Sequence, residues 1–136
     1  MGSIHGDTLI SDNSSQTIYG AAGRDRIFGL DGDDFLFGQG GSDDINGGAG
    51  NDFIDAGGGY DRLVYNVAAF GQDYIEGFDA LGNDYLDFRG SGLSATDLTI
   101  MDHGWDVLVS FAGNPGSSIM FENMTVATLD TTDWLF

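Results

Sequence analysis

The stretch Gly47-Gly48-Ala49-Gly50-Asn51-Asp52-Phe53-Ile54-Asp55 decides the fold, because its spacing of glycine, aspartate and isoleucine recurs through the first half of the chain. Read in nines from residue 2, the sequence forms seven units that end at residue 64. The eighth position is always aliphatic: Leu9, Ile18, Ile27, Leu36, Ile45, Ile54 and Leu63. The sixth position holds Asp7, Gln16, Asp25, Asp34, Asp43, Asp52 and Asp61. Self-similarity at a fixed period indicates a repeat architecture.

Each unit has the residues of one short strand and one tight turn. The aliphatic position and its two neighbours are enough for a minimal strand, and the glycines at the first and fourth positions suit a turn with positive φ. One aliphatic side chain per nine residues cannot form a core by itself, but seven stacked in register form a continuous apolar ladder. The sequence therefore predicts an all-β solenoid over residues 1–64.

The charge pattern predicts a cation-binding protein. The chain of 136 residues carries 22 acids and 4 bases, a formal net charge of −18, and this excludes nucleic acids and anionic membranes as partners. Stacking the repeats brings the aspartates to about 5 Å from one another, which is unfavourable unless a cation lies between the loops. Carboxylate and carbonyl oxygens without nearby histidine or cysteine favour Ca²⁺ over transition metals. No apolar run is long enough for a membrane span.

The unit resembles the RTX (repeats-in-toxin) nonapeptide G-G-x-G-x-D-x-U-x, most closely at residues 47–55. The resemblance implies a right-handed parallel β-roll in which two nonapeptides make one turn, so that each ion lies between loops 18 residues apart. The implied aspartate pairs are Asp7/Asp25, Asp25/Asp43 and Asp43/Asp61 on one flank and Asp34/Asp52 on the other. A fifth site is expected between the Asp52 loop and the segment after residue 64, which gives about four or five Ca²⁺ ions. The pair of Gln16 and Asp34 is a poor site because Gln16 brings no charge.

The resemblance also implies that backbone carbonyl oxygens bind each ion. One loop offers the carbonyls of its second and fourth repeat positions, and the next loop offers those of its first and third. For Asp25 and Asp43 this gives six oxygens, within the range of calcium. The implied carbonyl ligands are Gly20, Ala21, Ala22, Gly23, Leu30, Gly32, Gly38, Gln39, Gly40, Gly41, Gly47, Ala49, Ala56 and Gly58. A further set of candidate metal ligands comprises Gly48, Gly50, Asp73, Asp79 and Asp84.

The second half, residues 65–136, loses the nine-residue register and is expected to form an antiparallel β cap over the open end of the roll. Alternating and β-branched residues predict a hairpin over residues 98–111. This half resembles the segment that follows RTX repeats in proteins exported by type I secretion. Its ending, Asp133-Trp134-Leu135-Phe136, resembles the uncleaved signal of that pathway. The alternative is a last strand that packs in the cap.

The export resemblance implies an extracellular protein that meets the type I secretion machinery while unfolded. The start of the chain shows no basic region followed by an apolar run, so no N-terminal secretory signal is expected. No catalytic residue is predicted, because His5 and His103 are the only histidines and form no zinc or nucleophile-activating pattern. Similar modules accompany catalytic domains in serralysin-type metalloproteases and mannuronan C-5 epimerases, so we expect a non-catalytic folding and secretion domain of a larger protein.

An alternative function is the binding of an anionic polysaccharide by a larger secreted enzyme. Arg26 and Arg62 share the seventh repeat position 36 residues apart, and Arg24 belongs to the adjoining loop, so the three are candidate glycan-binding residues. Plain charge compensation of neighbouring aspartates is the competing interpretation. The aromatic residues beside the strands are likewise either side faces of the roll or a patch for a glycan or partner: Phe28, Phe35, Phe37 and Phe53.

Overall fold

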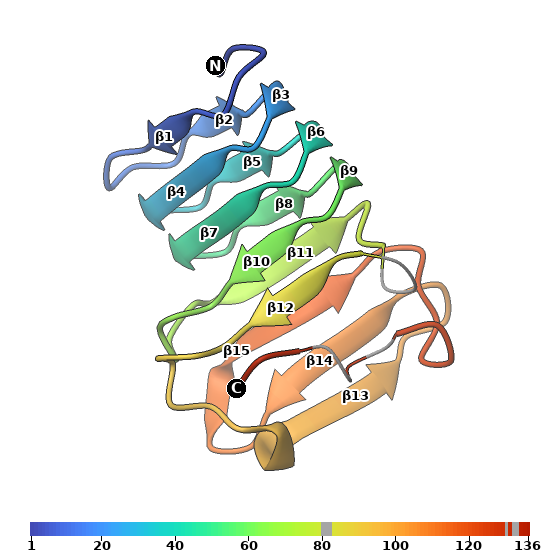
Figure 1. Cartoon of the computed structure of the whole chain (residues 1–136). Coiled ribbons are helices and arrows are strands. Elements are labelled where there is room, and N and C mark those ends of the chain that lie inside the picture. Colours follow the sequence, from blue (N-terminus) through green and yellow to red (C-terminus); the bar gives the residue numbers. More distant parts are fainter. Residues whose placement is uncertain (80–82, 130, 132–133) are drawn as a thin grey trace.

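The chain folds as two facing sheets of stacked strands, shown in Figure 1 by a computed structural model that describes residues 1–79, 83–129, 131 and 134–136. The first sheet has the order β1 (Thr8–Ile10), β4 (Arg26–Asp31), β7 (Asp44–Ala49), β10 (Arg62–Val64) and β12 (Tyr85–Asp87). The second sheet has the order β13 (Leu98–Asp102), β14 (Val107–Phe111), β15 (Asn114–Phe121), β11 (Gln72–Glu76), β8 (Phe53–Asp55), β5 (Phe35–Phe37) and β2 (Thr17–Tyr19). The expected all-β fold class is confirmed.

Parallel pairing runs in steps of 18 residues through the repeats. Ile27 pairs with Ile45 in the first sheet, and Leu36 pairs with Ile54 in the second. Successive nonapeptides therefore alternate between the sheets, and two of them make one turn. A small third sheet of two-residue strands joins the loops on one flank: β3 (Ala22–Gly23), β6 (Gly40–Gly41) and β9 (Gly58–Gly59).

The aliphatic ladder forms the core of the roll. Ile27, Leu36, Ile45, Ile54 and Leu63 are at most 1% exposed. Removing each such side chain from water contributes about 2 kcal/mol, so the ladder holds the two sheets together. Their neighbours along each strand point outward because strand side chains alternate between faces.

The parallel roll continues beyond the last nonapeptide, to about four turns. Ile75 of β11 pairs with Ile54, and Leu86 of β12 pairs with Leu63, although these spacings are no longer 18 residues. The antiparallel part therefore begins at β13, and the parallel strands between residue 65 and β13 belong to the roll. This continuation leaves one core shared by roll and cap.

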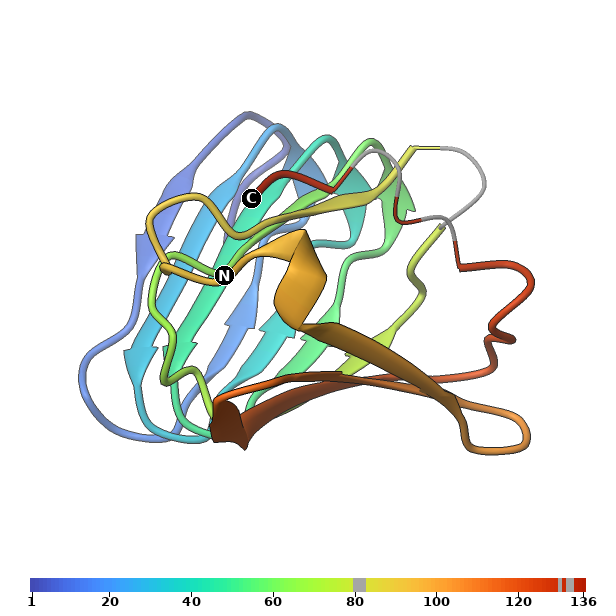
Figure 2. The same ribbon diagram turned by 90° about the horizontal axis from the view of Figure 1, so that it is seen from below.

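The cap is built from the hairpin β13–β14 and from β15, which pairs in parallel with β11. The expected hairpin is present, with Leu98 opposite Phe111 and Asp102 opposite Val107. Figure 2 shows the short 3-10 turn η1 (Ala95–Asp97) at this end of the molecule. Aromatic side chains fill the cap core: Phe70, Phe88, Phe111, Phe121 and Trp134. Among the described residues, no helix has the length and apolar character needed to cross a membrane.

Candidate metal centres

The repeat aspartates stand in two columns, one along each flank of the roll. Each lies directly before a strand, as Asp25 does before β4 and Asp34 before β5. The parallel register then stacks every aspartate on the one 18 residues away. Asp25, Asp43 and Asp61 stack on the first flank, and Asp34 and Asp52 on the second.

One carboxylate oxygen of each stacked aspartate is used inside the protein. The backbone N–H of Asp25 donates to Oδ1 of Asp43 at 2.9 Å, and that of Asp43 donates to Oδ1 of Asp61 at 2.8 Å. On the other flank the N–H of Asp34 donates to Oδ1 of Asp52 at 2.9 Å. These bonds hold each carboxylate in one orientation against the next loop.

The second oxygen, Oδ2, is buried and has no hydrogen-bond partner among the described residues. This is true of six aspartates: Asp25, Asp34, Asp43, Asp52, Asp61 and Asp73. An unsatisfied buried carboxylate oxygen is strongly unfavourable, and a cation is the ligand that compensates it best. The aligned orphan oxygens are therefore the observation that points to metal ions.

Burial also disfavours the ionised form of five aspartates, Asp34, Asp43, Asp52, Asp61 and Asp73. Burial, together with neighbouring carboxylates, raises the pKa of Asp43 and of Asp52 to about 6 and that of Asp61 to about 7. For Asp73 the same causes raise the pKa to about 8. A divalent cation between the loops reverses this effect, because it favours the charged carboxylate.

Backbone oxygens from the neighbouring loop reach the same places as Oδ2. A Cβ atom added to Gly20 would lie 2.8 Å from Oδ2 of Asp25 and 2.7 Å from the carbonyl oxygen of Gly38. A Cβ added to Gly38 would likewise meet Oδ2 of Asp43 and the carbonyl oxygen of Ala56. Only a residue without Cβ leaves this small space free for an ion.

The loop conformation is strained in a repeated way. Three non-glycine residues at the second repeat position have positive φ: Ala21 at 85°, Leu30 at 74° and Gln39 at 72°. Such values are uncommon outside glycine and cluster at functional sites. The fourth position has φ between 116° and 147° in Gly23, Gly32, Gly41, Gly50 and Gly59.

The donor set fits calcium. Among the described residues, no three or more histidine, cysteine, aspartate or glutamate side chains converge closely enough to hold one metal ion. A bound ion would therefore take two aspartates and complete its shell with loop carbonyls, which is hard-oxygen coordination typical of Ca²⁺. The carbonyls of Ala21 and Gln39 already accept the N–H groups of Gly40 and Gly58, and each keeps a second lone pair.

The structure brings the predicted carbonyl residues together in two stacks of loops. On one flank, β3, β6 and β9 stack the loops that hold Gly20, Ala21, Ala22, Gly23, Gly38, Gln39, Gly40, Gly41, Ala56 and Gly58. On the other flank, the ends of β4 and β7 stack the loops that hold Leu30, Gly32, Gly47, Gly48, Ala49 and Gly50. Gly29 is absent from the predicted set, yet an added Cβ there would lie 2.6 Å from Oδ2 of Asp34. The sequence does contain a sign of this role, because Gly29 begins one of four successive units that start with glycine.

Asp7 differs from the other column members. Its N–H donates to Oδ1 of Asp25 at 2.7 Å, so it lies in the column. Its own Oδ2 accepts the N–H of Ser3 at 2.5 Å, and this bond to the Ser3 backbone lowers the pKa of Asp7. Asp7 is only partly buried at the open end of the roll.

Of the three candidate acids after residue 64, Asp73 and Asp84 extend the aspartate columns and Asp79 does not. The N–H of Asp52 donates to Oδ1 of Asp73 at 3.0 Å, and the N–H of Asp61 donates to Oδ1 of Asp84 at 2.9 Å. Asp73 has an orphan Oδ2, whereas Oδ2 of Asp84 accepts the N–H of Asp79 at 2.7 Å. Asp73 therefore lies where the fifth site is expected. Asp79 itself is exposed.

The three candidate arginines share the outer side of the first sheet. Asp44 is the register partner of both Arg26 and Arg62, and ion pairs of 3.9 and 3.5 Å join it to them. Arg24 lies 3.7 Å from the same carboxylate. Arg62 also binds the buried Asp87 at 2.5 Å.

The C-terminal residues pack in the cap. Trp134 is 5% exposed, Leu135 bridges in parallel to Asp87, and the ring of Phe136 stacks on Phe88 at 5.1 Å. Asp133 lies outside the described residues. In the folded protein these described residues therefore form the packed end of the cap.

Comparison with known proteins identifies the repeats. A model of the family "RTX calcium-binding nonapeptide repeat (4 copies)" matches residues 10–45 and 29–63. The first half of the chain is thus a run of RTX calcium-binding repeats, folded as a β-roll. No curated protein matches the chain.

Solved structures share the whole fold. The extracellular lipase LipA from Serratia marcescens superposes with a TM-score of 0.73 at 18% identity, over 95% of this chain and 20% of the lipase. The AlgE6R3 subunit of the Azotobacter vinelandii mannuronan C5-epimerase gives a TM-score of 0.57 at 24% identity, over 100% of this chain and 81% of that one. The AlgE6R2 subunit of that enzyme gives a TM-score of 0.59 at 24% identity, over 96% of this chain and 91% of that one. This chain spans about a fifth of the lipase.

Proposed function

We propose that the chain is a calcium-dependent folding module, and that residues 1–64 and the cap of residues 65–136 acquire their structure when about four or five Ca²⁺ ions bind. The observation that carries the proposal is the double column of buried carboxylates whose Oδ2 atoms have no partner within the described residues. The RTX family match over residues 10–63, which hold five of these six aspartates, supports Ca²⁺ as the ion.

The driving force is electrostatic. At a formal net charge of −18 the ion-free chain repels itself, and five Ca²⁺ ions would leave about −8. The sites require stacked loops, which an unfolded chain lacks, so the free energy of ion binding becomes free energy of folding. Extracellular calcium modules bind at about 10⁻⁴ to 10⁻³ M, so the chain would stay unfolded at cytosolic calcium levels and fold outside the cell.

A calcium titration tests this function directly. Far-UV circular dichroism and calorimetry on one sample should show a cooperative coil-to-β transition with about four or five ions bound. Magnesium at the same concentrations should give little transition, because Mg²⁺ keeps its waters and demands a tighter octahedral shell. Equal β content in chelator and in calcium would refute the proposal.

Secretion is the second part of the proposal. The chain would be exported unfolded by a type I machinery that reads the C-terminal segment, and it would serve as the non-catalytic end of a larger extracellular protein. Co-expression with a type I exporter, comparing the full chain with a version lacking residues 134–136, measures this role. Export of the shortened chain at the full level would refute it, and the calcium titration on the purified chain separates export from folding.

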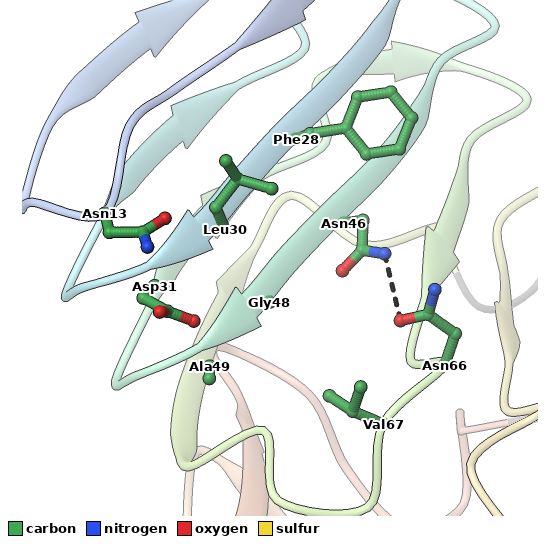
Figure 3. A pocket seen from close by; sticks show the side chains of 9 residues that line it. All are labelled: Asn13, Phe28, Leu30, Asp31, Asn46, Gly48, Ala49, Asn66 and Val67. Carbon is green, nitrogen blue, oxygen red and sulfur yellow. Dashed lines mark hydrogen bonds between the residues drawn. The ribbon is translucent and has the colours of Figure 1, made fainter.

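A second candidate function, the docking of an anionic polysaccharide, is favoured by two adjoining hollows on the first sheet. One of about 220 Å³ is lined by Arg26 and Arg62, by Asn46 and Asn66, and by Asp44, whose carboxylate pairs with both arginines. The next, of about 420 Å³, shares Phe28 and the two asparagines, whose amides bond to each other at 3.2 Å (Figure 3). Arginine for carboxylates, amides for hydroxyls and an aromatic face suit an acidic sugar chain.

Binding of oligouronates to the calcium-loaded chain tests this candidate. Arg26→Ala should weaken binding at least threefold. Arg89→Ala removes the same charge but lines neither hollow, so it should change binding less than twofold. Equal effects of both substitutions would show that the interaction depends on overall charge only.

A further inference from the structure

The outer face of the second sheet carries an unbroken row of apolar side chains that the calcium sites do not use. Register pairs connect these residues one by one across six neighbouring strands, from β5 to β13. We call this row the apolar stripe: Phe35, Phe53, Tyr74, Met120, Leu108 and Met101. With strands about 4.8 Å apart, it extends over about 24 Å.

The two ends of the stripe are exposed to solvent, and its four middle residues are partly exposed: Phe53, Tyr74, Met120 and Leu108. Phe35 is 52% exposed and Met101 is 42% exposed, while the residues that alternate with the stripe, such as Ile54 and Ile75, are buried in the core. The ring of Phe53 lies 5.8 Å from that of Phe35 and 5.9 Å from that of Tyr74. Phe53 stacks on Tyr74 and is tilted against Phe35, so the aromatic part of the stripe is a continuous surface of neighbouring rings.

The repeat itself does not require this surface. Phe35 and Phe53 occupy the seventh repeat position, and the same position on the first sheet holds Arg26, Asp44 and Arg62. Since a charged row satisfies the fold on one sheet, the apolar row on the other is free to serve recognition. Contiguous exposed apolar patches of this kind mark interaction sites.

A row of carboxylates borders the stripe on one side. Asp55 pairs with Glu76, the N–H of Glu122 donates to the carbonyl of Ile75 at 2.9 Å, and Asp106 accepts the N–H of Asn123 at 3.0 Å. We call these four the acidic row: Asp55, Glu76, Glu122 and Asp106. It contains both glutamates of the chain. Every ion pair among the described residues involves Asp44 or Asp87, so none reaches this row.

We propose that the apolar stripe and the acidic row together form a docking surface for a basic amphipathic polypeptide segment, one with an apolar ridge beside a line of lysine or arginine. Charge complementarity selects this occupant, because the chain is strongly acidic and the row has no cation of its own among the described residues. An uncharged ligand would desolvate four carboxylates without compensation. Lysine or arginine would in addition lie against the aromatic rings of the stripe.

A synthetic peptide tests the surface. The probe is an 18-residue peptide of leucine and lysine in an amphipathic helical pattern, about 27 Å long as a helix. Its binding to the calcium-loaded chain is measured by fluorescence anisotropy. The dissociation constant should rise at least fivefold in Glu76→Gln/Glu122→Gln and at least threefold in Phe35→Ser. The control Asp12→Asn/Asp31→Asn removes the same charge elsewhere on the surface and should change it less than twofold. Circular dichroism in calcium verifies the fold of each variant.

Several outcomes would overturn the proposal. A leucine and glutamate peptide of the same pattern that binds as tightly would exclude charge complementarity. Equal weakening by the two charge variants would show attraction to overall charge alone. Displacement of the probe by a neutral glucan or by zwitterionic lipid vesicles, or loss of the free surface through dimerisation of the chain in sedimentation, would assign the stripe to a different occupant.

Discussion

Asp43→Asn is expected to change folding in opposite directions with and without calcium. Asp43 is 1% exposed and stands between Asp25 and Asp61 in the middle of its column. Asparagine keeps the oxygen that accepts the N–H of Asp25 and removes the negative charge. The substitution therefore isolates the charge of the orphan oxygen from the packing of the loop.

Without calcium, the substitution should stabilise the folded state. Burial raises the pKa of Asp43 from 3.8 to about 6, which corresponds to at most about 3 kcal/mol of unfavourable free energy for the ionised form at neutral pH. Screening by solvent at the loop edge reduces this to about 1–2 kcal/mol. The assay is folding in chelator at pH 7 induced by an excluded osmolyte and followed by circular dichroism, and the midpoint should move to lower osmolyte concentration.

With calcium, the same substitution removes a charged ligand from two proposed sites, those with Asp25 and with Asp61. The calcium midpoint should rise at least tenfold, which is about 1.4 kcal/mol. The matched control is Asp44→Asn, next in sequence but directed outward to the arginines, which should leave the calcium midpoint within twofold. A variant that folds less readily in chelator, or an unchanged calcium midpoint, would refute the reasoning.

Three further predictions concern the ion-free and ion-loaded fold. In chelator, β structure should increase as the pH falls from 8 to 4, because Asp61 and Asp73 have folded-state pKa values of about 7 and about 8, above the usual 3.8, and protonation then favours the fold; a pH series of far-UV spectra that shows the reverse trend would contradict this. In calcium, Gly41→Ala should lower the free energy of unfolding by more than about 2 kcal/mol, since Gly41 has φ 147° and its added Cβ would overlap the carbonyl of Gly23 in the preceding loop of the stack. Gly92→Ala, at φ 81° in open space, should cost about 1 kcal/mol. Denaturant unfolding of the two variants should reproduce this order. Ile45→Ala should cost about 2–5 kcal/mol by the same measurement, because Ile45 is fully buried in the ladder, and a cost under about 1 kcal/mol would mean that the ladder does not carry the core.

The nine-residue pattern was sufficient to predict the roll. Once a residue type recurs at a fixed spacing, stacking in register is the arrangement that buries every aliphatic at once. The step of 18 residues that sets Ile27 over Ile45 came from the resemblance to the RTX repeat, because the nine-residue period alone does not say how many units make one turn. The aspartate columns follow from the same register, and their need for a cation follows from electrostatics. The sequence pattern does not show which loop carbonyl oxygens face an ion, because that depends on the orientation of each peptide group in the folded loop.

Beyond residue 64 the arrangement depends on long-range pairing. Asp73 and Asp84 join the columns at spacings of 21 and 23 residues, and no repeat period indicates that they should. The apolar stripe likewise exists only because β15 pairs in parallel with β11, which sets Met120 beside Tyr74. Pairing between strands separated by long loops is decided by how the whole cap core packs. Tertiary structure therefore determined which residues after residue 64 became neighbours. Within the repeats, the recurring pattern itself determined which positions stack on one another.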